Sequence, residues 1–400
     1  MRGSPAGASP ANPRQPPRRF SPSRPPPAEL TAPDFYTKFI NAHGYPIVAS
    51  TQVDDYALRE AAYLVDLMLA HRPDVRDAMI ASGSRLCVIG HKEFTTDLPE
   101  FAKLGPVAGF DGISAKDFWD ARARGTGGSQ SDPYCSCGEE NLLSYDGDPY
   151  STECILIHEF AHNLHLRGLV RIDPTFDGRV RAAYDKAMSD GLWKGKYASV
   201  NHHEYFAEGV QSWFDNNREN DHDHNHVNTR AELVEYDPRL AELCKEVFGD
   251  TELKYTKPVT RLTGHMAGYD PAKAPKFAWP ARLAAAQASI RQQAEARNRK
   301  AERKPEPPTE TATKPQQPPA NPWLTLDRIL KNGEFGERGP KGLVWSRRSP
   351  SNFTFESPKQ GDKGRDLVRN DNVTATQEVV VPGAAFVPTG SNNAPSIASF

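Results

Sequence analysis

Two histidines and a glutamate stand in the apolar run ECILIHEFAHNLHLRGL, residues 153–169. His158 and His162 are four residues apart, and on a helix such residues lie on one face about one turn apart. Their imidazole nitrogens can therefore reach one metal ion, and imidazole is a common ligand of zinc. Glu159 completes the HExxH pattern, in which the glutamate is the general base that takes a proton from zinc-activated water. The sequence predicts a zinc site with Glu159 as its base.

A simpler interpretation is that two core histidines are held by hydrogen bonds alone. A chain of this length and histidine content contains HExxH by chance with a probability of about 2%. The apolar neighbours predict a buried helix, in which histidine and glutamate side chains without partners would be costly. A metal ion removes that cost, so the zinc site is favoured.

His165 is not expected to bind the same zinc. It stands seven residues after His158, on nearly the same side of the helix but about 10 Å further along the axis. The longer motif HExxHxxGxxH requires histidine at position 168, where the sequence has Gly168. A structural role is predicted for His165.

The third ligand is expected in NHHEYFAEGVQSWFD, residues 201–215. Glu204 and Glu208 lie one turn apart on one face of a predicted helix, among apolar and aromatic residues. One carboxylate can complete a His, His, Glu site, and the other can accept the remaining N–H of a zinc-bound imidazole. The spacing alone leaves open which glutamate has which role.

These two segments resemble the zinc peptidase domain of anthrax lethal factor and its relatives, which include the Pro-Pro endopeptidases. In that family the HExxH helix is followed by a tyrosine and, seven residues later, by the liganding glutamate of an ExFAE motif. Here Tyr197 stands seven residues before Glu204, the first residue of EYFAE. The resemblance implies that His158, His162 and Glu204 bind Zn2+. It also implies that Glu208 orients a bound imidazole and that Tyr197 stabilises the oxyanion.

The resemblance covers about residues 35–250, with firm motifs only in residues 154–214. It implies an α+β, zincin-like fold, mostly helical with a small sheet, and a gluzincin-type zinc metalloendopeptidase acting on a peptide or protein. It also implies a secreted or cell-envelope location, although no signal peptide is visible. Two alternatives stay open: an inactive peptide-binding module with the same fold, and a zinc hydrolase of a non-peptide amide.

Composition argues against several other classes of function. The formal net charge is -2 and the pI is about 6.6, which gives no electrostatic case for binding nucleic acid or a membrane surface. No apolar run approaches the ~18 residues of a membrane span.

Five cysteines neither require nor exclude disulfides. Cys135 and Cys137 are too close to pair with each other, so either would need a distant partner such as Cys154. The oligomeric state is not predicted.

Hydrophobic patterns predict the elements before the HExxH motif. One helix is expected soon after Ala32. The elements expected next are a long amphipathic helix in residues 54–71, a short helix that Gly83 ends, a buried strand in residues 85–90, and loop in most of residues 98–138.

Two further expectations concern the segment around the motif. NLLSY, residues 141–145, is expected to be an edge strand that can pair with an extended peptide. The HExxH helix is expected to start within residues 148–153 and to stop at Gly168.

A histidine-rich segment, NDHDHNHVNTR, follows the second motif. His222, His224 and His226 alternate, so an extended chain would place them on one side, toward a second metal or a substrate. A solvated loop near the site is the favoured interpretation.

Composition divides the chain into four parts. Residues 1–31 are predicted to be a disordered Pro/Arg-rich tail, and residues 32–280 the zinc metallopeptidase-like domain. Residues 281–322 are expected to be an exposed helix with no wide apolar face, followed by a Pro-rich linker. Residues 323–400 resemble the opening of the β-propeller of dipeptidyl peptidase IV-type proteins. That segment is an incomplete propeller, and without a GxSxG motif it implies no serine peptidase activity.

Overall fold

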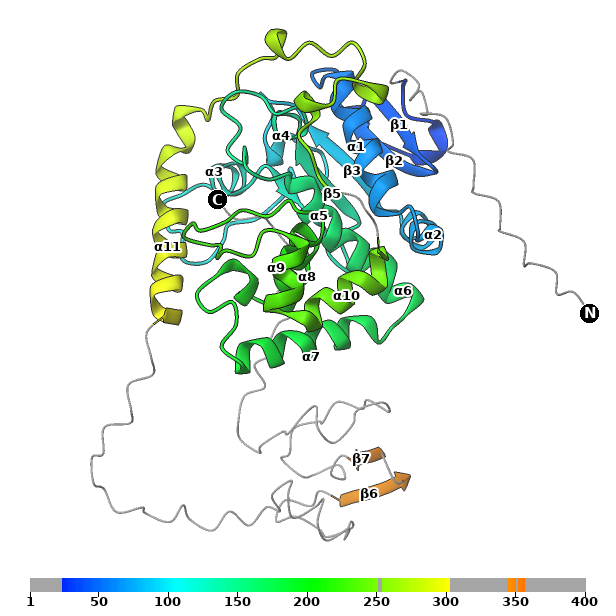
Figure 1. Cartoon of the computed structure of the whole chain (residues 1–400), viewed down its shortest axis with the longest axis vertical. Coiled ribbons are helices and arrows are strands. Elements are labelled where there is room, and N and C mark those ends of the chain that lie inside the picture. The colour runs from blue at the N-terminus through cyan, green and yellow to red at the C-terminus, as the bar shows by residue number, and fades with distance from the viewer. Residues whose placement is uncertain (1–23, 251–253, 303–343, 350–351, 357–400) are drawn as a thin grey trace, which may run out of the picture. The chain divides into compact units, whose positions relative to one another are not determined.

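The computed structural model describes residues 24–250, 254–302, 344–349 and 352–356 (Figure 1). These residues divide into two units, one reaching from residue 24 to residue 302 and one made of two later strands. The first unit combines helices with a small mixed sheet, which confirms the predicted α+β class.

A five-stranded sheet forms one layer of the first unit. In spatial order its strands are β1 (Lys38–Ala42), β2 (Tyr45–Ala49), β3 (Arg85–Ile89), β5 (Tyr134–Gly138) and β4 (Gly125–Thr126). β2, β3 and β5 are parallel to one another, whereas β1 and β4 run antiparallel to their neighbours at the two edges. Alternate residues of β3 face opposite sides: Leu86 and Val88 join the main core, and Cys87 and Ile89 join a second cluster on the other face.

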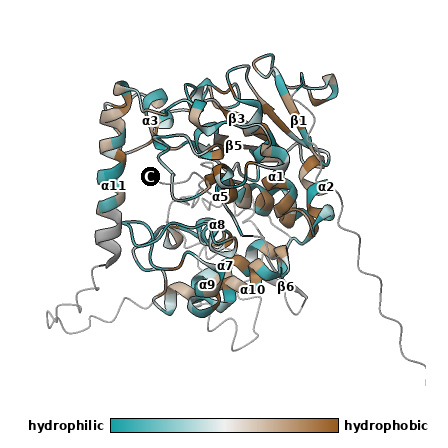
Figure 2. Ribbon diagram, turned by 45° about the horizontal axis from the view of Figure 1, so that its top comes forward, coloured by the Kyte–Doolittle hydropathy of each residue, from teal (hydrophilic) through white to brown (hydrophobic). Residues whose placement is uncertain are grey.

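The first unit also contains helices, most of which pack in the main core on one face of the sheet. They are α1 (Asp55–Met68), α2 (Pro73–Ala81), α3 (Ala115–Arg122), α4 (Glu139–Leu142), α5 (Ile155–Asn163), α6 (Val170–Ile172), α7 (Phe176–Ser189), α8 (His202–Trp213), α9 (Arg230–Tyr236), α10 (Pro238–Phe248) and α11 (Ala284–Glu302). α1 packs against β1 and β2, and α5 packs against β5 and β4 on one side and against α8 on the other. α7, α9 and α10 surround α8. Hydrophobic residues are prominent on β1 and α5 (Figure 2).

The predictions for residues 54–90 are confirmed. Helix α1 begins after Asp54, whose carboxylate accepts a hydrogen bond from the amide of Tyr56 at 2.8 Å. The five apolar residues of its predicted inner face, Leu58, Ala61, Ala62, Val65 and Leu69, are all buried. Helix α2 is followed by Gly83 with a φ of 79°, and β3 is buried along its whole length.

The helix expected soon after Ala32 is wrong, because β1 and β2 form a hairpin there. Its turn contains His43 and Gly44, whose φ angles of 53° and 96° belong to the left-handed region that two-residue hairpin turns require. The strand expected in residues 141–145 is also wrong. Asn141 and Leu142 end helix α4 and the next residues form a turn, so β1 and β4 are the edges of this sheet. Residues 98–138, expected to be mostly loop, contain α3, β4 and β5.

Helix α5 begins and ends later than the sequence predicts. Its first turn is capped from a distance, because the side-chain oxygen of Asn141 accepts from the amide of Ile155 at 2.9 Å. The helix continues beyond Asn163 as a π-helical segment, Leu164–Leu169, and then as α6. Gly168 does not end it. A Cβ at Gly168 would lie 2.6 Å from Val75 on α2, so this glycine permits close helix packing.

The predicted Ala-rich helix forms as α11, but it is not exposed on all sides. Leu283, just before it, and Ala286 and Ile290 within it are buried against Phe118 and Ala121 of α3. This helix therefore belongs to the first unit. The predicted linker in residues 303–322 lies outside the described residues.

Few of the predictions for the two ends of the chain fall on described residues. Residues 1–23 of the predicted disordered tail lie outside the described part, and residues 28–30 form a short 3-10 turn. In the second unit, β6 (Val344–Ser349) and β7 (Asn352–Glu356) form an antiparallel pair. The rest of the segment that resembles a propeller is not described.

The five cysteines, all in the first unit, are free and buried. Cys154 is therefore not paired with Cys135 or Cys137 in this structure. Within the described ranges, none of the helices combines the length and hydrophobicity that crossing a membrane requires.

If α11 is an integral part of the first unit, Leu283→Ala should destabilise it. Leu283 has 0% exposure, and removing a buried leucine side chain typically costs about 2–5 kcal/mol because a cavity remains. Thermal and urea unfolding should show this loss. Gln287→Ala, a partly exposed control on the same helix, should change the unfolding free energy little, and equal stability of the two variants would contradict the packing described.

Candidate metal centre

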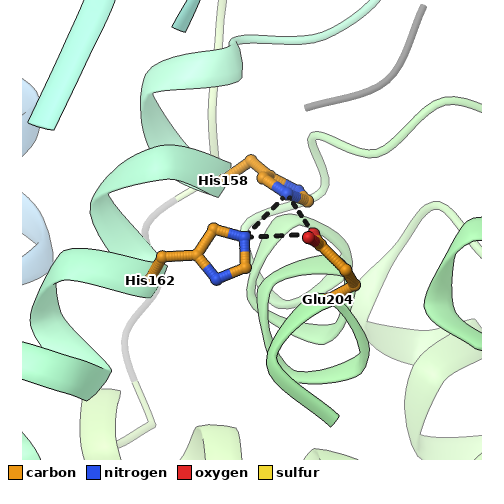
Figure 3. A group of neighbouring side chains, drawn as sticks. All are labelled: His158, His162 and Glu204. Carbon is orange, nitrogen blue, oxygen red and sulfur yellow. Dashed lines mark hydrogen bonds and ion pairs between the residues drawn. The ribbon is translucent and has the colours of Figure 1, made fainter. Parts of the chain in front are cut away.

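Helices α5 and α8 bring three predicted ligands together in the protein interior. His158 and His162 project from one face of α5, and Glu204 reaches them from the first turn of α8 (Figure 3). The two Nε2 atoms lie 3.1 Å apart, and each lies 3.1 Å from Oε2 of Glu204. Three donor atoms from two helices thus form an equilateral triangle.

The size of this triangle fits a small metal ion. Tetrahedral zinc with bonds of about 2.0–2.1 Å holds its ligand atoms about 3.3–3.4 Å apart. The observed separations of 3.1 Å need only a slight expansion. The exposures of His158, His162 and Glu204 are 2%, 0% and 4%, so water has little access to form hydrogen bonds with their polar atoms. A divalent cation would satisfy all three groups at once.

The start of α8 fixes the position of Glu204. Asn201 is the N-cap residue, and its side-chain oxygen accepts hydrogen bonds from the amides of His203 at 2.8 Å and Glu204 at 3.0 Å. This cap sets where the first helical turn begins. The carboxylate of Glu204 is therefore directed by a defined helix terminus.

Gln211, one turn after Glu208 on the same face of α8, orients the first histidine. Its side-chain oxygen lies 2.8 Å from Nδ1 of His158 and accepts the hydrogen bond from that N–H. Nε2 of His158 then carries the lone pair that a metal needs. Gln211 is held in turn because its amide nitrogen donates to Glu153 at 2.7 Å, and Glu153 pairs with Arg218 at 2.9 Å.

Glu208 lies on the other side of the same imidazole. Its Oε1 is 3.4 Å from Nδ1 of His158, and its Oε2 accepts from the side-chain amide of Asn217 at 2.9 Å. Oε2 also lies 3.4 Å from Nε2 of His224, whose Nδ1 is 2.8 Å from Asp221. Glu208 is therefore close enough to act on His158 but does not join the triangle of donor atoms.

The charges of these groups shift their proton affinities in opposite directions. Burial lowers the pKa of His158, but the hydrogen bonds that Glu204 and Glu208 accept from it outweigh burial and raise that pKa well above 6.5. Burial lowers the pKa of His162. Burial raises the pKa of Glu204, yet the neighbouring imidazoles His162 and His158 bring it below its usual value. A metal ion bound here displaces the proton that His158 otherwise carries.

Glu159 is directed to the edge strand beside the triangle. It is fully buried, and a Cβ at Gly125 on β4 would lie only 2.9 Å from its Cγ. A Cβ at Gly127 would collide with His162. These two glycines let the end of the sheet approach α5 closely, which puts β4 next to both the predicted base and a predicted ligand.

Arg124 anchors the start of β4. Its guanidinium has 0% exposure and pairs with Glu140, Nη2 to Oε2, at 3.0 Å. Nη2 also donates to the carbonyl of Gly90 at 3.0 Å, at the end of β3. A buried charge held by several acceptors fixes its backbone strongly, so the position of β4 relative to α5 is defined.

Tyr197 lies beside the first histidine. It begins the 3-10 turn Tyr197–Ser199 that precedes α8, and its ring centroid is 6.1 Å from that of His158. Its amide donates to the carbonyl of Asp223 at 2.8 Å, and the residue is 3% exposed. The structure thus brings Tyr197 to the same side of the site as the segment of residues 221–226.

The three alternating histidines of that segment do not share one side. His224 is buried on Glu208, His226 packs its ring edge on Tyr236, and His222 contacts Asp223 with its side chain 42% exposed. The favoured interpretation as a solvated loop is therefore wrong for His224, which is buried and contacts Glu208 beside the triangle of donor atoms.

His165 lies outside the triangle, as the sequence predicts. It sits in the π-helical segment, is 0% exposed, and packs its ring edge against Phe176 and Phe206. Its Nε2 is 3.3 Å from Asp177.

Sequence reasoning missed Gln211 and Glu153, and it named His224 without foreseeing its contact with Glu208. A signal for Gln211 exists, because positions 204, 208 and 211 follow the spacing of one helix face. The contacts of Glu153 and His224 could not be found in this way, since they join segments distant in the chain.

Comparisons with known proteins find similarity among solved structures. No family model matches the sequence, and no curated protein matches it. Among solved structures, the Pro-Pro endopeptidase PPEP-2 from Paenibacillus alvei is similar over 50% of this chain and 97% of that chain, with 19% sequence identity and a TM-score of 0.35. A similarity at this level assigns no activity to the chain.

The pairing of His224 predicts a pH-dependent stability. Burial lowers the pKa of His224, but the charges of Glu208 and Asp221 outweigh it and raise that pKa from 6.5 to about 9. A raised pKa in the folded state stabilises the fold below pH 6.5, and this contribution is lost as the pH rises through 9. The melting temperature of His224→Gln should therefore lie furthest below that of the wild type near pH 6 and approach it near pH 10. A gap that stays constant with pH would contradict this charge pairing.

Proposed function

We propose that this chain is a zinc-dependent metallopeptidase. The observation that supports it most strongly is the buried triangle of His158, His162 and Glu204, with all three donor separations at 3.1 Å and Glu159 in the same helical turn. Hydrogen bonds alone do not require such a set, whereas a His, His, Glu site with an adjacent glutamate is what metal-assisted hydrolysis needs. The resemblance of HEFAH and EYFAE to the lethal factor family points to the same chemistry.

The proposed reaction assigns one task to each side chain. His158, His162 and Glu204 hold Zn2+, which supplies Lewis-acid activation of water and of a carbonyl group when bound. Glu159 takes a proton from the attacking water and delivers it to the leaving amine. Gln211 and Glu208 keep His158 in the tautomer whose Nε2 faces the metal.

Tyr197 is proposed to stabilise the oxyanion. Its ring lies beside His158, and a phenolic O–H can donate to the negative charge that develops on the carbonyl oxygen. Donors that act on developing charge contribute more to the transition state than to substrate binding, so Tyr197 acts mainly on kcat.

The substrate is proposed to bind as an extended peptide along β4. This strand is at the edge of the sheet and borders Glu159 at Gly125, and Gly127 just after the strand borders His162. Among the described residues no further strand occupies its outer side. Main-chain pairing along such an edge holds a peptide with its carbonyl groups in register with the site. β4 takes the role that the sequence had assigned to residues 141–145.

Metal analysis together with a broad peptide library separates this proposal from its two alternatives. Bound zinc with peptide cleavage supports the peptidase. An intact fold that retains no zinc at His158 and His162 points to the peptide-binding module. Zinc without cleavage of any peptide points to hydrolysis of a non-peptide amide.

Glu159→Gln should abolish most turnover and leave the metal in place. The amide cannot accept the proton of water, and loss of a general base typically lowers kcat by about 10²–10⁴-fold. Peptide cleavage and zinc content should be measured on the same preparation. A variant with near-normal kcat would show that Glu159 is not the base.

The two glutamates of α8 should differ in their effect on zinc. Glu204→Ala removes one of three protein ligands, so this variant should hold one equivalent of zinc fewer than the wild type. Glu208→Ala leaves all three ligands and Gln211 in place, so its affinity should fall by about 10–100-fold and excess metal should restore the full zinc content. Titration with zinc against a chelator measures both. Normal zinc content in the Glu204 variant, with loss in the Glu208 variant, would reverse the two roles.

A further inference from the structure

A second group of imidazoles surrounds one carboxylate next to the metal centre. Asp177 lies in the first turn of α7, His202 and His203 begin α8, and His165 belongs to the π-helical segment after α5. Oδ1 of Asp177 lies 2.9 Å from Nε2 of His202, 3.2 Å from Nε2 of His203 and 3.3 Å from Nε2 of His165. Two segments of chain therefore direct three imidazoles to a single oxygen atom on a third segment.

Helix geometry does not produce this arrangement by itself. Adjacent residues of a helix point in directions about 100° apart and do not normally face each other. His202 and His203 nevertheless turn their rings to a centroid separation of 4.0 Å, and both reach Asp177. The ligand atoms of Asp177, His202 and His203 all lie within 4.8 Å of one another. Their convergence resembles that of His158, His162 and Glu204.

Hydrogen bonds do not satisfy this group. A carboxylate oxygen has about two lone-pair positions, fewer than the three imidazole nitrogens that surround Oδ1. His165 has 0% exposure, and neither of its ring nitrogens has a hydrogen-bond partner in the described part of the chain. A fully buried imidazole without partners is costly, and its Nε2 is aimed at this cluster.

We propose that Asp177, His202 and His203 form a second metal site, which the buried His165 borders. Imidazole nitrogens with one carboxylate select a divalent transition ion such as Zn2+ rather than Ca2+ or Mg2+. The observed separations of 2.9 and 3.2 Å between donors are close to the edges of a tetrahedral zinc site, about 3.3 Å. The ion gives His202 and His203 a partner for their lone pairs.

The site is open to solvent on one side. The side chains of His203 and Asp177 are 29% and 25% exposed, whereas those of His202 and His165 are 9% and 0% exposed. An ion can thus enter from the His203 side and be held by buried donors behind it. A cation also borders the site: Nη2 of Arg181 is 3.4 Å from Nε2 of His202 and 3.9 Å from Oδ2 of Asp177.

The second site would adjoin the segments that carry the first. His165 follows the ligand His162 by three residues, and His203 immediately precedes the ligand Glu204. A metal that binds Asp177, His202 and His203 therefore joins the start of α7 to the start of α8, beside His165. The expected role is structural: it fixes the start of α8, which carries Glu204 of the first site.

Zinc stoichiometry of the whole chain tests the second site without using activity. After loading with Zn2+ and removal of free metal, the wild type should hold two equivalents. Asp177→Asn/His203→Gln, which removes two donors with little change in shape, should hold one. His158→Gln/His162→Gln should also hold one, and the fourfold variant should hold none. His71→Gln/Asp74→Asn, a pair on the exposed surface, is the matched control and should still hold two.

The same comparison separates this inference from the proposed function. If only the first site fails, the wild type holds one equivalent and Asp177→Asn/His203→Gln holds none. If Asp177→Asn/His203→Gln holds as much zinc as the wild type, the second site is overturned. Co2+ gives an independent measurement that does not need that variant: His158→Gln/His162→Gln loaded with Co2+ should show a visible d–d absorption band that Zn2+ removes. Absence of that band overturns the proposal as well.

Discussion

The packing of α5 against α8 is the contact on which the rest of the site depends. It buries two imidazoles and a carboxylate where water cannot compensate them, so each polar atom needs a partner within the protein or a bound cation. His158 shows how this demand spreads outward. Its Nδ1 engages Gln211, Gln211 engages Glu153, and Glu153 engages Arg218. The contacts that satisfy one histidine of the triangle therefore extend as far as Arg218.

The sheet also packs closely against the buried site, and residues without a side chain make this possible. β4 can border Glu159 and His162 only because positions 125 and 127 lack a side chain. The buried ion pair of Arg124 with Glu140 holds the strand there, since moving it would expose an uncompensated charge to the core. Glycine permits the approach and the ion pair maintains it. An edge strand at this place gives the proposed peptide substrate a backbone to pair with.

Local pattern was sufficient to predict some elements and insufficient for others. α1 and the histidine pair of α5 follow from periodicity, because residues three and four apart share a helix face whatever the rest of the fold does. β5 has the sequence YCSCG, which has little strand character, and it becomes a strand through pairing with β3 and β4. NLLSY has the apolar residues of a strand, yet Asn141 is used to cap α5 and to bond the carbonyls of Tyr150 and Glu153. Such contacts between distant segments cannot be read from spacing.

The π-helical segment accounts for the difference between His162 and His165. In a continuous α-helix, residues three apart lie on one face about 4.5 Å apart along the axis, so both histidines would be directed toward α8. The wider π turn begins at Leu164, between them, and changes the direction of every later side chain. His162 therefore faces Glu204, while His165 faces Asp177. One irregular turn thus directs the two histidines to two different carboxylates, and π turns occur often at functional sites.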